Sequence, residues 1–182
     1  MNPFALLITW TTYGTWLPGD SRGHISNVRH ADGSWEKARN VPGTAFMQGD
    51  IRTRDHARSL LKHDPVWLNR EQAEVVAAEL LVATKSRGWR IRRAAVMSNH
   101  VHVVIDECPD HGPTVRRILK GTTQAALSRN AGRTQCWWTE GGSDRYKHGS
   151  AAIENAIHYV AKQHNILAEV IDQASGGACP HR

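Results

Sequence analysis

The sequence has few cysteines, and their spacing excludes two classes of small stabilised protein. The three cysteines are Cys108, Cys136 and Cys179, an odd number without a Cys-x-x-Cys pair. A disulfide framework needs paired cysteines, and a cysteine-rich zinc site needs them closely spaced. We therefore expect neither, and we expect the protein to work in a reducing cytoplasm.

The sequence also lacks a hydrophobic run long enough to cross a bilayer. Its N-terminal apolar stretch, residues 4–10, is far shorter than the ~20 residues that a spanning helix needs. No basic region precedes it, so we do not expect a signal peptide or an anchor. The stretch predicts the first strand of a sheet, and no membrane partner is expected.

Acidic residues are outnumbered by basic ones. The 17 Asp and Glu against 23 Lys and Arg give a formal net charge of +6 and a pI near 9.6. This balance suits a nucleic-acid partner, although charge alone does not identify one. The candidate phosphate contacts are Arg92, Arg93, Arg116, Lys120, Arg145 and Lys147. For any one of them a solvated surface cation is the simpler interpretation.

Two histidines one residue apart stand in a run that is typical of a buried strand. In residues 100–106, Val101 and Val103 alternate with His100 and His102. Because side chains alternate between the two faces of a strand, the valines can enter a core while both imidazoles share the other face. Two neutral imidazoles at this spacing can bind one divalent metal ion, but a His-x-His pair alone is a weak signal.

A second motif lies near the C-terminus. Residues 150–167 have apolar residues at helical spacing, which predicts an amphipathic helix with Ser150 as its N-cap. Tyr159 and Gln163 are four residues apart and would lie on one stripe of this helix. A phenol hydroxyl and a carboxamide could therefore reach the same point.

These motifs resemble those of a known family. The stretch from Met97 to His102, the helix with Tyr159 and Gln163, and the opening stretch of residues 8–23 are similar to single-tyrosine transposases of the IS200 type. Those proteins belong to the HUH endonucleases and are close to the REP-associated tyrosine transposases. One departure is Ser98, where many relatives have proline.

The resemblance implies roles for individual residues. His100, His102 and Gln163 would hold a divalent ion, and Tyr159 would attack a phosphate of single-stranded DNA. The product would be a covalent 5′-phosphotyrosine with a free 3′ hydroxyl. Such a protein would act on hairpin-containing ends of a mobile element, as a monomer or a homodimer.

The chemistry of the cluster narrows the choice of metal. An ion held by two imidazoles and an amide oxygen keeps its positive charge and can polarise a phosphodiester oxygen. Soft thiolates would select zinc, and none accompanies the cluster, so we expect Mg²⁺ or Mn²⁺. A phenol has an ordinary pKa near 10, so Tyr159 needs a nearby cation or base to become a good nucleophile.

The predicted elements follow one another in the order of an α+β fold. A strand over residues 4–12 precedes a long irregular segment, residues 17–66, whose role is open. A helix capped by Asn69, strands over 89–96 and 100–106, a helix opened by Pro113, a short strand and the tyrosine helix follow. This is the ferredoxin-like βαββαβ order, with an antiparallel sheet and helices on one face. We expect residues 1–182 to form one domain.

Several alternatives stay open. The protein could be a catalytically inactive nucleic-acid-binding module, or a histidine-metal phosphodiesterase that uses activated water instead of a tyrosine. Tyr146 is a rival nucleophile, and His158 and His164 are possible proton acceptors or metal ligands. For the neighbours Trp137 and Trp138 we expect one in the core and one exposed, as adjacent residues of a strand would be.

Overall fold

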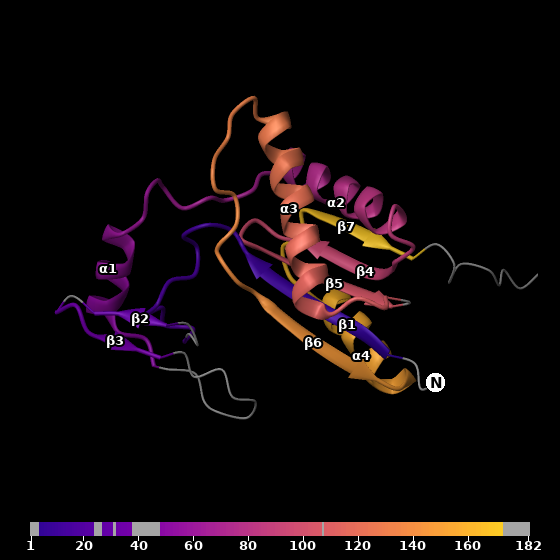
Figure 1. The fold of residues 1–182 in the computed structure, drawn as a ribbon, viewed down its shortest axis with the longest axis horizontal. Helices are drawn as coiled ribbons and strands as arrows, with labels where there is room; N and C mark the ends of the chain where they lie inside the picture. Colours follow the sequence, from indigo (N-terminus) through magenta and orange to yellow (C-terminus); the bar gives the residue numbers. More distant parts are fainter. Residues whose placement is uncertain (1–3, 24–26, 31, 38–47, 107, 173–182) are drawn as a thin grey trace, which may run out of the picture. The chain divides into compact units, whose positions relative to one another are not determined.

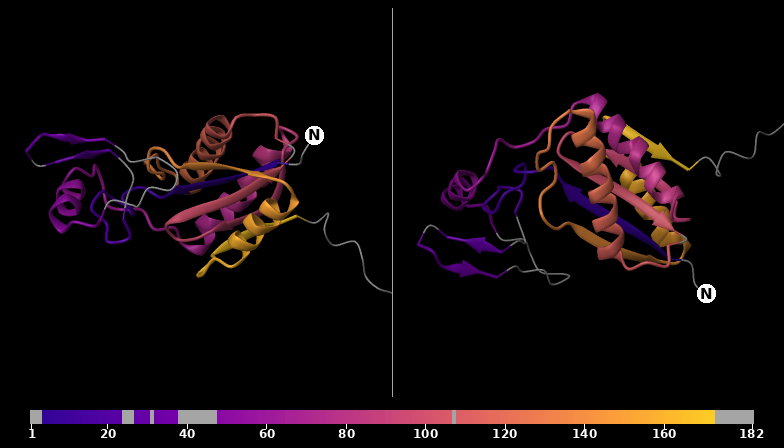
Figure 2. Two further views of the ribbon diagram at one scale, coloured as in Figure 1. Left: turned by 90° about the horizontal axis from the view of Figure 1, so that it is seen from below. Right: turned by 45° about the horizontal axis from the view of Figure 1, so that its top comes forward.

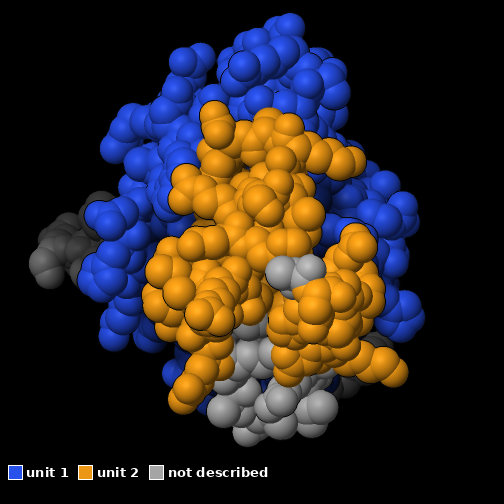
Figure 3. All heavy atoms as spheres, turned by 90° about the vertical axis from the view of Figure 1, so that its left-hand side faces the viewer, with its two compact units in different colours: residues 1–12, 67–182 blue, residues 13–66 orange. Residues whose placement is uncertain are grey.

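The computed structural model describes residues 4–23, 27–30, 32–37, 48–106 and 108–172. These residues form two compact units (Figure 3). Unit 1 comprises residues 1–12 and 67–182, and unit 2 comprises residues 13–66. No helix among the described residues is both long and apolar enough to span a membrane.

Unit 1 is built on a five-stranded antiparallel sheet (Figure 1). Its strands are β1 (Phe4–Thr11), β4 (Arg90–Val96), β5 (His100–Asp106), β6 (Ser143–His148) and β7 (Ala168–Ile171), in the spatial order β6-β1-β5-β4-β7. Its helices are α2 (Arg70–Lys85), α3 (Gly112–Asn130) and α4 (Ser150–Ala161). The first six elements have the predicted βαββαβ order, so the α+β ferredoxin-like fold is confirmed. Strand β7 was not predicted.

Helices cover both faces of this sheet. In the right-hand view of Figure 2, α2 and α3 lie in front of the sheet and α4 lies behind it. Leu6 lies close to Gly112 at the start of α3, whereas Leu7 belongs to a core cluster with Ile153 and Val160 of α4. The prediction of helices on one face is therefore right for α2 and α3 and does not extend to α4. Alternation along β1 supplies apolar side chains to both layers.

The helix starts follow from local chemistry. Asn69 and Gln72 form a reciprocal capping box, in which each side chain accepts a hydrogen bond from the other residue's backbone N–H (2.9 and 3.0 Å). The predicted cap of α2 is thus confirmed. Helix α4 starts differently: Gly149, at φ +81°, is the N-cap in place of Ser150. This backbone angle favours glycine and lets β6 run directly into α4.

Helix α4 is also shorter than predicted, since it ends at Ala161 and not at residue 167. The apolar residues beyond it are buried by other means. Ile166 packs against the α4 core cluster, and the backbone N–H of Leu167 donates to the carbonyl of Val96 (2.9 Å). Asn165, at φ +56°, lies just before these two residues in the left-handed region of the backbone, which a helix cannot continue through. The helical periodicity therefore continued into a turn that leads to β7.

Unit 2 has more regular structure than its sequence predicted. It contains the short paired strands β2 (Val28–Arg29) and β3 (Trp35–Glu36) and the helix α1 (Ile51–Ser59). None of the residues of α1 is buried, and Asp50 caps the helix by accepting a hydrogen bond from the N–H of Thr53 (2.7 Å). The absence of a buried face explains why α1 left no periodicity in the sequence.

Both tryptophans of the neighbouring pair are buried, so the expectation of one exposed ring is wrong. Trp137 is 1% and Trp138 5% exposed. The Nε1 of Trp137 donates to Ser128, and Trp138 packs edge-on against Trp10 at 5.9 Å. Strand alternation does not apply, because Trp138 makes only an isolated bridge to Thr12 outside the named strands.

Two glycines of α3 give opposite predictions for replacement by alanine. A Cβ at Gly112 would come within 2.7 Å of the Cβ of Asp144, whereas a Cβ at Gly121 would meet nothing within 4 Å. We expect Gly112→Ala to lower the free energy of unfolding by about 1–3 kcal/mol through overpacking. Gly121→Ala should raise it by about 0.5–1 kcal/mol through helix propensity. Urea unfolding measures both, and equal effects would contradict the packing at the start of α3.

Candidate functional site

The two histidines of β5 lie on the sheet face that α4 covers. Thr9 of β1 and Ala95 of β4 are both opposite His102 in the strand pairing, and Ala95 belongs to the α4 core cluster. On the other side of the strand, Val101 and Val103 are fully buried. The expected division of this strand into an apolar face and a histidine face is therefore present.

Tyr159 meets these histidines within one chain. The ring centroids of His100 and His102 are 4.9 Å apart, and those of His102 and Tyr159 are 5.3 Å apart, with both pairs near a T-shaped geometry. Tyr159 is 50% exposed, whereas His102 is 5% exposed. The ring cluster, defined as His100, His102 and Tyr159, is thus anchored in the sheet and open to solvent at its phenol.

Hydrogen bonds fix the orientation of both imidazoles. The Nδ1 of His100 lies 2.6 Å from the side-chain Oδ1 of Asn99, and the Nδ1 of His102 lies 2.6 Å from the hydroxyl of Thr9. The Asn99 oxygen can only accept, so Nδ1 of His100 donates and the lone pair of the neutral ring is on Nε2. A histidine that binds a metal through one ring nitrogen usually makes a hydrogen bond through the other, as these two rings do through Nδ1. Sequence reasoning missed Thr9, because only strand pairing brings it here.

Burial keeps His102 neutral. It lowers the pKa of His102 from 6.5 to about 4, and the charge of His100 acts in the same direction. A neutral imidazole is the form that binds a metal ion. Above about pH 4 the ring therefore has a nitrogen lone pair available for coordination.

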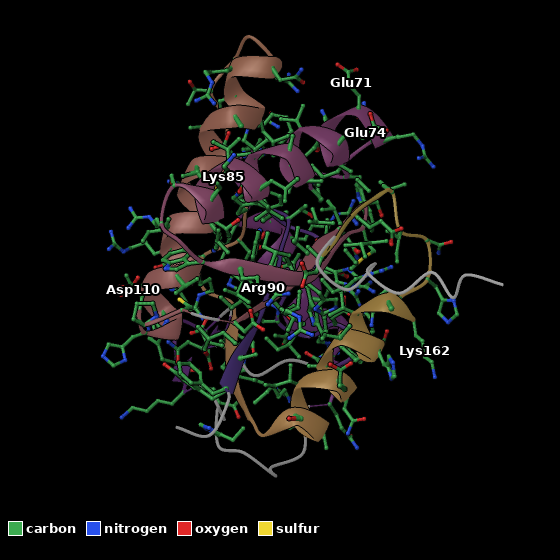
Figure 4. All side chains as sticks on the ribbon, turned by 90° about the vertical axis from the view of Figure 1, so that its right-hand side faces the viewer. Glu71, Glu74, Lys85, Arg90, Asp110 and Lys162 are labelled. Carbon is green, nitrogen blue, oxygen red and sulfur yellow. The ribbon has the colours of Figure 1, made fainter. Side chains whose placement is uncertain are left out.

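Gln163 lies just beyond the end of α4, close to the backbone of the tyrosine. Its Nε2 donates to the carbonyl oxygen of Tyr159 (3.0 Å), so the carboxamide is held at the last turn of the helix. The amide oxygen is the atom that suits a hard cation. Lys162, the C-cap, extends into solvent from the same end of α4 (Figure 4).

The donor set for an ion is one of mixed nitrogen and oxygen atoms. In the described part of the chain, no group of three His, Cys, Asp or Glu side chains is arranged to hold a metal. An ion at the ring cluster would therefore need two imidazoles and the Gln163 amide, with water or a phosphate to complete its shell. The fixed imidazoles fit that requirement.

Four of the six candidate phosphate contacts bind groups of the chain itself. The contacts are Arg92 with Asp106 (2.7 Å), Arg93 with Glu169, Arg116 with Asp144 (2.6 Å), and Lys120 Nζ with the carbonyl oxygens of Thr139 (2.5 Å) and Gly141 (2.6 Å). Burial lowers the pKa of Lys120 to about 8. These side chains connect strands and loops, and their contact with phosphate stays a prediction.

Arg145 and Lys147 lie on the histidine face of the sheet. In the pairing of β6 with β1, Arg145 is opposite Leu7 and Lys147 is opposite Ala5, and both partners belong to the α4 core cluster. Side chains that are directly opposite in a ladder share one face. These two cations are therefore the predicted phosphate contacts whose position suits the ring cluster.

The rival nucleophile Tyr146 lies on the other face. It is opposite Leu6, and its hydroxyl accepts a hydrogen bond from the backbone N–H of Gly112 (3.1 Å) at the start of α3. The ring cluster lies on the α4 side. The geometry therefore brings Tyr159, and not Tyr146, to the histidines.

Comparisons with known proteins add a likeness in structure. No family model and no curated protein matches the sequence. The structure is similar to a solved REP-associated tyrosine transposase bound to a REP hairpin, with a TM-score of 0.45 and 8% sequence identity. The match covers 88% of this chain and 66% of that protein, so the chain spans about two thirds of its length.

The low pKa of His102 predicts a pH-dependent stability. Between about pH 6.5 and pH 4 the unfolded chain binds a proton at His102 that the folded chain does not. The free energy of unfolding should therefore decrease as the pH is lowered through this interval, by on the order of 3 kcal/mol for this group. Urea unfolding at about pH 7 and about pH 5 should show a smaller difference for His102→Gln than for the unchanged protein. His158→Gln, which removes an exposed imidazole of α4, is the control and should keep the difference of the unchanged protein. An equal pH-dependent difference in His102→Gln and His158→Gln would contradict the assignment.

Proposed function

We propose that the chain is a metal-dependent single-strand DNA endonuclease and strand transferase, and that Tyr159 is its nucleophile. The observation that carries the proposal is the contact of the Tyr159 ring with His102 inside one chain, with half of the phenol side chain exposed. A buried phenol could not reach a DNA phosphate, and a distant one could not use an ion held by the histidines.

The metal site uses the histidines in the orientation described. The Nε2 atoms of His100 and His102 and the amide oxygen of Gln163 would hold Mg²⁺ or Mn²⁺. When bound, the ion supplies positive charge that polarises a phosphodiester oxygen. Asn99 and Thr9 hold the rings in place, which reduces the reorganisation needed at the site.

The reaction exchanges one phosphodiester for another. The phenol oxygen of Tyr159 forms a bond to phosphorus, and the bond from phosphorus to the 3′ oxygen breaks. The phenol proton leaves to solvent through the exposed side of the ring, and the 3′ oxygen takes up a proton to become a hydroxyl. The 5′-phosphotyrosine conserves the ester bond, so rejoining to another 3′ hydroxyl needs no nucleotide cofactor.

We propose that Arg145 and Lys147, which lie on the same sheet face, contact phosphates of the DNA. We propose single-stranded DNA with hairpin-containing element ends as the substrate and DNA transposition as the process. The ring cluster is complete in one chain, which favours a site that does not borrow its tyrosine from a second subunit.

The proposed nucleophile can be tested through the covalent intermediate. Incubation with Mn²⁺ and a labelled single-stranded hairpin DNA should give an adduct that survives denaturation, and Tyr159→Phe should form none. Tyr13→Phe, which removes a phenol from unit 2, is the matched control and should form the adduct. Mass spectrometry of a digest should place the nucleotide on the peptide that contains Tyr159.

Each other outcome would indicate a different activity. An adduct in Tyr159→Phe would overturn the assignment of the nucleophile. Cleaved DNA without an adduct would instead indicate a histidine-metal phosphodiesterase that uses water, and binding without cleavage would indicate an inactive nucleic-acid-binding module.

A further prediction concerns the hydroxyl beside His102. Thr9→Val keeps the shape of the side chain and removes the hydrogen bond to Nδ1, so Mn²⁺ affinity should fall about 10- to 100-fold. Thr11→Val is the matched control, because Thr11 lies opposite His100 on the same strand and its hydroxyl makes no hydrogen bond within the described residues. Calorimetric titration with Mn²⁺ measures both, and equal affinities would refute the positioning role.

A further inference from the structure

Three aromatic side chains gather at the β6 edge of the sheet, on the face opposite the ring cluster. The rings of Tyr146 and His148 are nearly parallel, at 9° with centroids 6.3 Å apart. The ring centroid of Phe4 on β1 lies 6.3 Å from that of Tyr146 and 6.4 Å from that of His148. We call Phe4, Tyr146 and His148 the aromatic platform.

The platform is exposed to a degree that core packing does not explain. Phe4 is 37% and Tyr146 45% exposed, and His148 is also exposed. No residue of β6 is buried. Cross-strand aromatic pairs often stabilise a sheet by covering one another, but here each ring keeps an open side. The Tyr146 hydroxyl, held by the N–H of Gly112, fixes the orientation of its ring.

The surroundings of the platform favour a polyanion. Arg145 and Lys147 alternate with Tyr146 and His148 along β6 and point to its other face. The carboxylate of the same strand, Asp144, is paired with Arg116 at 2.6 Å. An edge strand with exposed aromatic rings on one face and cations on the other suits single-stranded nucleic acid. Its bases can stack on the rings while the cations neutralise its phosphates.

We propose that unpaired bases of single-stranded DNA stack on the aromatic platform. The rings of Tyr146 and His148 are nearly parallel and exposed, so a base can stack against them, and Phe4 borders the pair. Since β6 is the outermost strand of the five-stranded sheet, a DNA strand can pass around it to the face with Arg145 and Lys147. The inference rests on the proposed function for the identity of the ligand and adds the residues that bind its bases.

The platform is also connected to the nucleophile by a short path in the chain. Gly149 alone separates His148 from α4, and Tyr159 lies ten residues further, about 15 Å along the helix axis. A strand several nucleotides long can therefore contact both. Bases held on the platform would position a phosphate near the phenol.

The experiment compares a ring with an aliphatic side chain at one position. Fluorescence anisotropy is measured with a labelled oligothymidine of about 15 nucleotides, in EDTA and in a Tyr159→Phe background, so that no cleavage occurs. Tyr146→Leu should raise Kd about tenfold. Tyr146→Phe also lacks the hydroxyl that binds Gly112 but keeps the ring, so it should stay within about twofold of the parent.

An abasic oligomer of the same length is the second arm. It has phosphates without bases, so Tyr146→Leu and His148→Leu should leave its affinity unchanged. The salt dependence of oligothymidine binding should also be unchanged in these variants, because stacking releases no counterions. Equal affinity of Tyr146→Leu and Tyr146→Phe for oligothymidine would overturn the proposal, as would an equal loss with the abasic oligomer or with a blunt duplex.

The two proposals fail in different ways. The platform is measured by binding without metal and without Tyr159, so an absent covalent adduct leaves that result intact. An adduct with full activity in Tyr146→Leu, together with unchanged oligothymidine affinity, would retain the proposed function and remove the platform. His148→Leu provides an independent measurement where Tyr146→Leu folds poorly.

Discussion

The pairing register between β1 and β5 is the constraint on which the candidate site depends. It sets Thr9 opposite His102, so that one strand supplies the imidazole and its neighbour supplies the hydroxyl that holds it. A slip of one residue would turn both imidazoles toward α2 and α3 and put valines in their place. The buried residues Val101 and Val103 oppose such a slip, because it would move them out of the layer under α2 and α3 and put polar imidazoles in their place. The hydrophobic core therefore fixes the geometry of a polar site.

Helix α4 adds the second half of the arrangement. Ile153, Ala156 and Val160 attach it to the sheet, and Tyr159 lies beside this apolar stripe, with its ring against His102 and half of its surface in solvent. A reactive phenol needs both properties, since firm attachment positions the ring and exposure admits a large substrate. The same helix thus contributes to stability through one side and to chemistry through its flank.

The sequence predicted what depends on local periodicity and left out what depends on pairing. Alternation in residues 100–106 placed both histidines on one face, and the capping pattern placed the start of α2 at Asn69. The predicted end of α4 was wrong, because Ile166 fits the helical periodicity but is packed against the core from a turn that follows the helix. Thr9 was missed, since its role arises from a strand more than ninety residues away. The platform partner of Tyr146, Phe4, is equally invisible without the sheet.

Strand β7 has a consequence for how the chain can associate. Helix α4 joins β6 to β7, the two outermost strands of the sheet, and β7 is paired with β4 over Ala168–Ile171. To donate α4 to a second copy, a subunit would have to detach β7 from its own sheet and break the Leu167–Val96 hydrogen bond as well. Exchange of the tyrosine helix between subunits is therefore opposed by an energetic barrier that lies outside the site itself, at the far edge of the sheet.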